Sequence, residues 1–126
     1  MSFRRQMSTM AKSTILIVED DALMAANLAA RVRKLGYVVL GPADTLEAAE
    51  ALIKAGAPDA ALLDFDVGGG ASTELAAGLA RAGVPVAFCT GHERLGGLPP
   101  ELKDAPLLRK PVSDDALKTV LAKLLV

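Results

Sequence analysis

The segment ALLDFDVGGG (residues 61–70) decides the fold class of this 126-residue chain. It begins with an apolar run of the kind that forms a fully buried strand. Asp64 and Asp66 follow this run at once, and three glycines come next. The segment therefore predicts a buried strand that carries carboxylates at its exit.

Similar short runs, rich in aliphatic and β-branched residues, recur along the chain between longer stretches of helical period. This alternation is typical of βα units around a parallel sheet. We expect a doubly wound open sheet of five parallel strands with helices on both faces, because crossover connections are right-handed. The five expected strands are residues 14–18, 37–40, 60–63, 84–89 and 106–108.

Local signals mark the helix ends. Ser72 and Ser113 are expected as N-caps, and Gly36, Gly56 and Gly83 as left-handed C-caps. Glycines and prolines within residues 96–100 interrupt the fourth helical segment. We therefore expect that helix to be short or irregular.

Composition limits the function classes. The formal net charge is -1, from 14 basic and 15 acidic side chains, so we expect no direct binding of nucleic acid. No apolar run reaches membrane-spanning length. The single cysteine, Cys89, fits a core residue in a reduced, cytoplasmic protein. We expect a polar N-terminal lead-in over residues 1–12 and one domain over residues 13–126.

Polar side chains follow four of the five expected strands. Glu19 and Asp20 come after the first, Asp64 ends the third, Thr90 the fourth, and Lys110 follows the fifth. The carboxyl ends of parallel strands meet at one edge of a sheet, where ligands bind. We therefore expect these residues to lie together.

Three carboxylates at one edge raise each other's pKa values, so they need a cation in order to stay ionised together. Lys110 supplies one positive charge. A hard divalent ion such as Mg²⁺ suits oxygen ligands and also bridges to phosphate oxygens. Asp64, at the centre of the edge, is then a candidate phosphoryl acceptor.

Each of these residues also has an ordinary structural explanation. Asp20 or Asp21 is suited to capping the first helix. Asp66 fits a loop residue that starts a glycine turn, and His92 has no metal-ligand spacing around it. It is the joint occurrence at successive strand ends that indicates a site.

The motifs ILIVEDD (15–21), ALLDFD (61–66), FCTG (88–91) and LLRKP (107–111) resemble those of receiver domains of two-component response regulators. The resemblance covers residues 13–126 and implies a flavodoxin-like sheet of order 2-1-3-4-5. It further implies that Asp64 is the phosphorylated aspartate. It implies that Asp20 is a direct Mg²⁺ ligand, that Glu19 is an acidic partner acting through water, and that the backbone carbonyl of Asp66 is a third ligand. Thr90 would be the switch hydroxyl and Lys110 the partner of a phosphoryl oxygen, with a cis peptide bond between Lys110 and Pro111.

Two positions depart from the pattern that this resemblance implies. Leu107 stands where the family often has a tyrosine or phenylalanine that moves on activation. The glycines at 68–70 replace a usual loop proline. FCTGH (88–92) and the glycine loop are also similar to a branch of stand-alone receivers that carry Phe-Ala-Thr-Gly-Tyr, from which Cys89 and His92 differ.

The same acceptor segment is also similar to the Asp-x-Asp-x-Val signature of haloacid-dehalogenase-type phosphatases. In that alternative Asp64 is the nucleophile and Asp66 the acid/base, Thr90 and Lys110 bind phosphate, and Asp114 with Asp115 forms a metal pair. Two βα units precede the nucleophile strand, however, and Glu19 and Asp20 are left unexplained. A receiver-like adaptor that is not phosphorylated is the third reading, because one fold hosts several functions.

We therefore expect a stand-alone phosphoacceptor that is not an enzyme beyond its own phosphorylation and dephosphorylation, with Mg²⁺ as its cofactor. The expected phosphodonor is a sensor histidine kinase or a histidine phosphotransfer protein. The chain then signals to an output protein by contact or acts as a phosphate sink. The sequence identifies neither the kinase nor the output protein.

Overall fold

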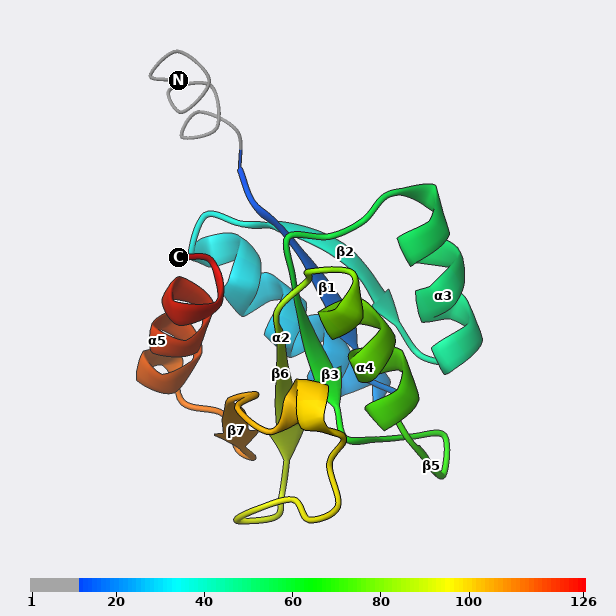
Figure 1. The fold of residues 1–126 in the computed structure, drawn as a ribbon. Helices are drawn as coiled ribbons and strands as arrows, with labels where there is room; N and C mark the ends of the chain where they lie inside the picture. Colours follow the sequence, from blue (N-terminus) through cyan, green and yellow to red (C-terminus); the bar gives the residue numbers. More distant parts are fainter. Residues whose placement is uncertain (1–11) are drawn as a thin grey trace.

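The structure, a computed structural model, describes residues 12–126 and is an α/β sandwich of three layers (Figure 1). The predicted lead-in lies outside the described residues except for Lys12. Five parallel strands form the central sheet in the order β2-β1-β3-β6-β7, which is the predicted order 2-1-3-4-5. They are β1 (Thr14–Val18), β2 (Val38–Ala43), β3 (Ala60–Asp64), β6 (Val86–Thr90) and β7 (Leu107–Arg109).

Helices cover both faces of the sheet, as Figure 1 shows. Successive strand residues point to opposite faces, so Ile15 and Ile17 pack on one core cluster while Leu16 and Val18 pack on the other. The first cluster lies under α2 (Ala22–Lys34) and α5 (Asp114–Leu124). The second lies under α3 (Leu46–Ala55) and α4 (Thr73–Arg81). Every residue of β3 and β6 is buried, as expected for central strands.

The fourth helical segment is irregular, as predicted. Between β6 and β7 the structure has only η1, a 3-10 turn over Pro100–Leu102. Pro100 starts this turn, where its missing N–H costs nothing. Leu102 is 1% exposed and joins the core cluster beneath α4, so packing holds the turn in place.

Three local predictions are confirmed. Ser113 caps α5 by accepting a hydrogen bond from the Ala116 N–H at 3.1 Å. Gly36 and Gly83 have φ values of 101° and 85°, in the left-handed region. Cys89 is a buried core residue, and burial raises the pKa of its thiol to about 12. None of the described helices is long and apolar enough to cross a membrane.

Two cap predictions are right in position and wrong in geometry. Gly56 follows α3 with φ 175°, which is extended backbone rather than left-handed. Ser72 stands before α4 but makes no side-chain cap bond. Its hydroxyl instead donates to the main-chain oxygens of Asp64 at 2.7 Å and Phe65 at 3.2 Å.

The second strand is longer than predicted. β2 runs on through Gly41 and Pro42 to Ala43, with an irregularity in its register beside β1. As an edge strand it tolerates a proline. Gly41 is required there, because its φ is 96° and an added Cβ would lie 2.7 Å from the Ala43 nitrogen.

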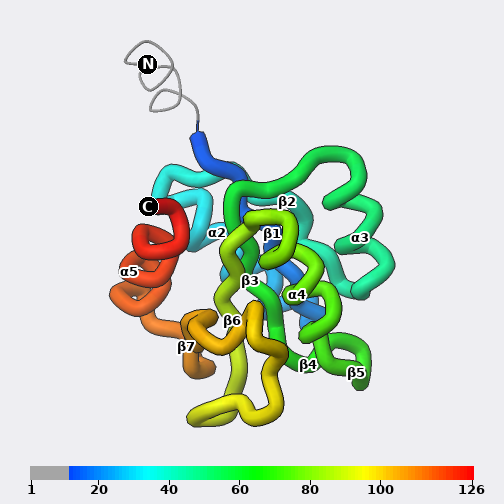
Figure 2. The backbone as a smooth tube through the Cα atoms, in the orientation of Figure 1, coloured from blue at the N-terminus to red at the C-terminus, as the bar shows by residue number. Residues whose placement is uncertain are grey.

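A small hairpin after β3 was not predicted as a strand pair. β4 (Asp66–Val67) and β5 (Gly70–Ala71) pair antiparallel around a two-residue turn. Gly68 and Gly69 form this turn with φ values of 61° and 82°, as a primed hairpin turn requires. Figure 2 shows the hairpin at the same end of the sheet as the segment that follows β6.

Candidate functional site

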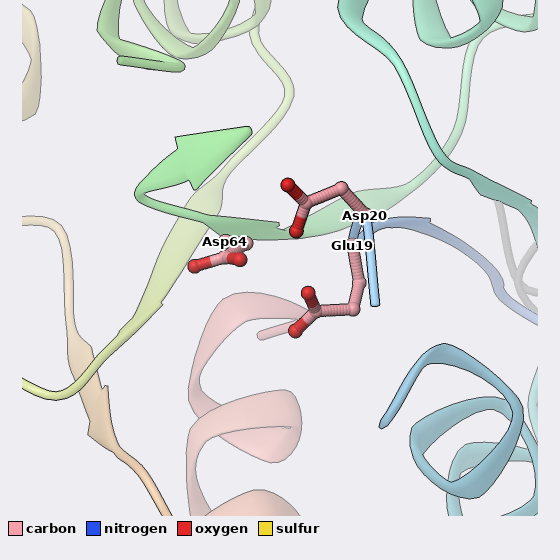
Figure 3. Close-up of side chains that lie close together, drawn as sticks. All are labelled: Glu19, Asp20 and Asp64. Carbon is pink, nitrogen blue, oxygen red and sulfur yellow. The ribbon is translucent and has the colours of Figure 1, made fainter. Parts of the chain in front are cut away.

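The predicted residues meet at the carboxyl ends of the strands. Glu19 and Asp20 follow β1, and Asp64 ends β3. Each of these three offers one carboxylate oxygen, and the three oxygens lie within 4.8 Å of one another (Figure 3). Lys110 follows β7, and its Nζ lies 3.0 Å from Glu19 Oε1 and 3.2 Å from Asp64 Oδ1.

Glu19 is fixed by three hydrogen bonds. Its N–H donates to the Ala43 oxygen at 2.9 Å, so the extended end of β2 helps to place it. Its Oε2 accepts from the Asp21 N–H at 3.1 Å. Its Oε1 accepts from Lys110. These bonds satisfy a side chain that is only 5% exposed, which a buried carboxylate requires.

Asp64 is nearly as buried, with 11% of its side chain exposed. Burial and, next, the neighbouring Glu19 raise the pKa of its carboxyl group while Lys110 lowers it, and the net pKa is about 6. The site therefore holds more negative charge than one ammonium balances. This is the electrostatic condition that a divalent cation relieves.

Lys110 stays charged in this setting. Burial alone would lower the pKa of its ammonium, but hydrogen bonds to Glu19 and Asp64 and their charges outweigh burial and raise it. The peptide bond from Lys110 to Pro111 is cis, as the resemblance implies. The main-chain N–H of Lys110 donates to the main-chain oxygen of Thr90 at 2.8 Å, and this bond joins the ends of β6 and β7.

Asp20 differs from the other two carboxylates because it is exposed. Its Oδ2 accepts a hydrogen bond from the Gly68 N–H at 2.9 Å. This bond is the main reason why the pKa of Asp20 lies below its usual value. The capping role considered for Asp20 or Asp21 falls to Asp21, whose Oδ1 accepts from the Met24 N–H at 2.9 Å.

The remaining predicted residues lie on the same edge. Thr90 is buried, and its Oγ1 accepts from the His92 N–H at 3.1 Å. Asp66 begins β4 two residues after Asp64, with an exposed side chain. The metal contact predicted for its main-chain oxygen stays a prediction.

The donor set fits Mg²⁺. Hard divalent cations take carboxylate and carbonyl oxygens and keep several waters. Two buried carboxylates and one exposed carboxylate supply such oxygens, while Cys89 points into the core as part of the cluster beneath α5. Glu19, Asp20 and Asp64 are therefore the side chains that would hold the ion.

Two residues that contribute main-chain contacts to the site were not predicted from the sequence. Gly68 acts through its main-chain N–H and Ala43 through its main-chain oxygen, and no side-chain pattern reports such contacts. The glycine run was the one available signal, since residues without a Cβ let the backbone approach other groups closely.

Comparisons with known proteins agree with this geometry. The family model described as the response regulator receiver domain matches residues 15–122. The chain therefore belongs to the receiver domain family of response regulators, as the motifs implied. A search of curated proteins found no significant match.

Solved structures give the same result. SdrG from Sphingomonas melonis Fr1 is 37% identical with a TM-score of 0.76, over 91% of this chain and 98% of that chain. The signal receiver domain of a modulated diguanylate cyclase from Desulfovibrio desulfuricans G20 is 31% identical, TM-score 0.77, over 91% and 94%. The REC domain of the PhyR response regulator from Erythrobacter litoralis is 27% identical, TM-score 0.79, over 93% and 92%.

Proposed function

We propose that this receiver domain accepts a phosphoryl group on Asp64 in the presence of Mg²⁺. The observation that carries the proposal is the ion pair of Lys110 with both Glu19 and Asp64, next to the Asp20 carboxylate. When bound, Mg²⁺ would neutralise charge on the transferred phosphoryl oxygens. Family membership supports a phosphoacceptor role in two-component signalling.

The chain's own residues supply position and charge. A P–O bond forms to an Asp64 oxygen while the P–N bond of a phosphohistidine breaks, and the leaving imidazole keeps that electron pair. The Lys110 ammonium, 3.2 Å from Asp64 Oδ1, is placed to attract an oxygen of the transferred group. We assign the Thr90 hydroxyl to an oxygen of the same group; in the structure this hydroxyl accepts from the His92 N–H.

The proposed donor is a sensor histidine kinase or a histidine phosphotransfer protein. A pocket beside the carboxylates is lined by residues of α2 and of the segment after β7, among them Leu28, Lys110 and Val112. At its rim Leu23 is 81% exposed and Met24 is 41% exposed. Exposed apolar side chains next to a reactive carboxylate favour a protein donor that covers them.

Incubation with acetyl phosphate and Mg²⁺ tests the proposal by intact-protein mass. We expect wild type to gain one phosphoryl group and Asp64→Asn to gain none, while Asp20→Asn needs more Mg²⁺. Asp104→Asn, a change to an exposed aspartate after η1, is the matched control and should behave as wild type. Equal phosphorylation of Asp64→Asn would contradict the assignment.

The same samples separate the alternatives. Turnover of a generic phosphomonoester would favour the phosphatase, whereas a folded protein that is never phosphorylated would favour the adaptor. Asp114, a proposed metal ligand in the phosphatase reading, instead pairs with Arg31 at 2.8 Å in the first turn of α5. We therefore expect phosphorylation without substrate turnover. Three expectations stay predictions: the cytoplasmic location, the stand-alone architecture, and whether the domain signals to an output protein by contact or acts as a phosphate sink.

A further inference from the structure

The glycine hairpin, residues 66–71, is attached to the rest of the domain at its base. Ser72, which follows it, is fully buried. Its hydroxyl donates to the main-chain oxygens of Asp64 and Phe65, and its N–H donates to the Phe65 oxygen at 2.8 Å. The chain therefore leaves β3 and returns to the same point before α4 begins. Such a closed base restricts where the tip can lie.

The tip of the hairpin touches one residue of the carboxylate cluster. Gly68 is the first of the two turn residues, and its N–H donates to Asp20 Oδ2. Asp20 is the exposed member of the cluster, whereas Glu19 and Asp64 are fixed by burial and by Lys110. The hairpin thus restrains the one carboxylate that burial leaves unrestrained.

The glycine at position 68 satisfies two requirements of this contact. It adopts φ 61° without a Cβ penalty, and it retains a main-chain N–H that a proline would lack. A carboxylate has two oxygens, so the bond from Gly68 uses one and leaves the other for an ion. A ligand held in place before the ion arrives loses less freedom on binding.

We infer that Gly68 is a positioning residue for the divalent cation, because its N–H fixes the Asp20 carboxylate in the orientation that binds Mg²⁺. The inference rests on the proposed function, since it assumes that this cluster binds Mg²⁺. Hydrogen-bonded partners of metal-ligating carboxylates commonly contribute about tenfold or more to metal affinity. Removal of the Gly68 N–H should therefore weaken Mg²⁺ binding by about tenfold.

The sharpest variant replaces only the N–H. Incorporation of glycolic acid in place of Gly68 turns the amide into an ester and leaves the side chain and chain length unchanged. The same replacement at Gly69 is the matched control, because that residue also has positive φ but the bond to Asp20 comes from Gly68. Mg²⁺ affinity is measured by calorimetry, and unfolding by urea shows whether both esters are equally stable.

We expect weaker Mg²⁺ binding for the ester at 68 and wild-type binding for the ester at 69. The phosphorylation rate with acetyl phosphate should recover at saturating Mg²⁺, because the ester changes occupancy of the site and not the acceptor. Equal affinity of the two esters would overturn the inference. Tighter binding by the ester at 68 would also overturn it, since the N–H would then compete with the ion.

A second measurement needs no variant. A scalar coupling across the hydrogen bond, from the Gly68 amide nitrogen to the Asp20 carboxylate carbon, should be present without metal and persist when Mg²⁺ is saturating. Loss of the coupling on Mg²⁺ addition would overturn the inference. A wild-type protein that binds no Mg²⁺ would instead contradict the proposed function, so the two failures are distinguishable.

Discussion

Asp64 binds its proton more tightly in the folded protein than in the unfolded chain, because its pKa is raised from 3.8 to about 6. A group of this kind stabilises the fold below its unfolded pKa, and this stabilisation is lost as pH rises through the folded value. The relevant window is therefore about pH 4 to 6. Above it, the buried carboxylate of Asp64 destabilises the metal-free protein.

Asp64→Asn removes this penalty. In metal-free buffer at pH 7.5 we expect the variant to exceed wild type in free energy of unfolding by about 1 to 2 kcal/mol, and the difference should shrink towards pH 4.5. Urea unfolding at the two pH values measures it. Addition of Mg²⁺ should then stabilise wild type more than the variant. A variant less stable than wild type at pH 7.5 would show that Asp64 contributes more through its contacts than it costs through its charge.

The lifetime of the acyl phosphate is expected to depend on Asp66 and His92. Both side chains are exposed, and they lie two residues beyond Asp64 and Thr90. If they flank the path of attacking water, Asp66→Ala and His92→Ala should make the phosphorylated protein decay severalfold faster, because smaller side chains admit water more easily. Loss of phosphate over time, followed by mass spectrometry, measures the decay.

Asp115→Ala, an exposed aspartate of α5, is the control for this comparison and should decay as wild type does. Identical decay in all four proteins would show that Asp66 and His92 do not limit water access.

At the residue scale the side chains of the site were predictable because each stands directly after a recognisable strand. Glu19, Asp20, Asp64 and Lys110 were predicted to meet, and the structure brings them together. Ser72 was read as a cap from its place before a helix, but its hydroxyl bonds back to β3 instead. Sequence position locates such a hydroxyl without specifying which of several nearby carbonyls it contacts.

At the element scale, η1 occupies the place of the fourth helix and is held by one buried side chain and one surface ion pair. Leu102 is 1% exposed, and Arg81 Nη1 lies 2.9 Å from Glu101 Oε2. Leu102→Ala should lower the free energy of unfolding by about 2 to 4 kcal/mol, because it leaves a cavity under α4. Glu101→Gln should lower it by clearly less than Leu102→Ala does, because exposed ion pairs contribute little.

Denaturant unfolding of the two variants gives both values. A smaller loss for Leu102→Ala than for Glu101→Gln would mean that the surface pair, and not packing, holds the turn.

The five sheet strands were predictable because each is a distinct apolar run between helical periods. The hairpin was not, because strands of two residues are too short to show an alternating pattern. β2 was predicted too short because a proline usually ends a strand, whereas an edge strand tolerates one.

At the scale of the whole molecule, the strand order and the three layers were predictable because crossover connections leave few topologies. Thr90 was predicted as the switch hydroxyl, but its hydrogen-bond partners could not be predicted from the sequence. Thr90 makes two such contacts: its main-chain oxygen accepts from the Lys110 N–H, and its hydroxyl accepts from the His92 N–H at the start of the mostly exposed segment 91–99. Movement of the Thr90 hydroxyl therefore changes the contact to the segment that follows β6, while the main-chain bond to Lys110 keeps β6 joined to β7.

Phosphorylation is expected to alter the segment 91–99. We expect the Thr90 hydroxyl to move towards a phosphoryl oxygen and to release the His92 N–H, which would free the start of a segment that contains two adjacent glycines, Gly96 and Gly97. Leu107 supplies no aromatic side chain to report the change, so the segment itself should shift population between two arrangements.

Beryllofluoride with Mg²⁺, a mimic of the phosphorylated aspartate, should move the amide resonances from Gly91 to Leu102. Thr90→Ala should abolish that response while the resonances of Glu19, Asp20 and Asp64 still move, and Thr119→Ala on α5 should respond as wild type. A response confined to the three carboxylates in wild type, or an intact segment response in Thr90→Ala, would contradict this relay.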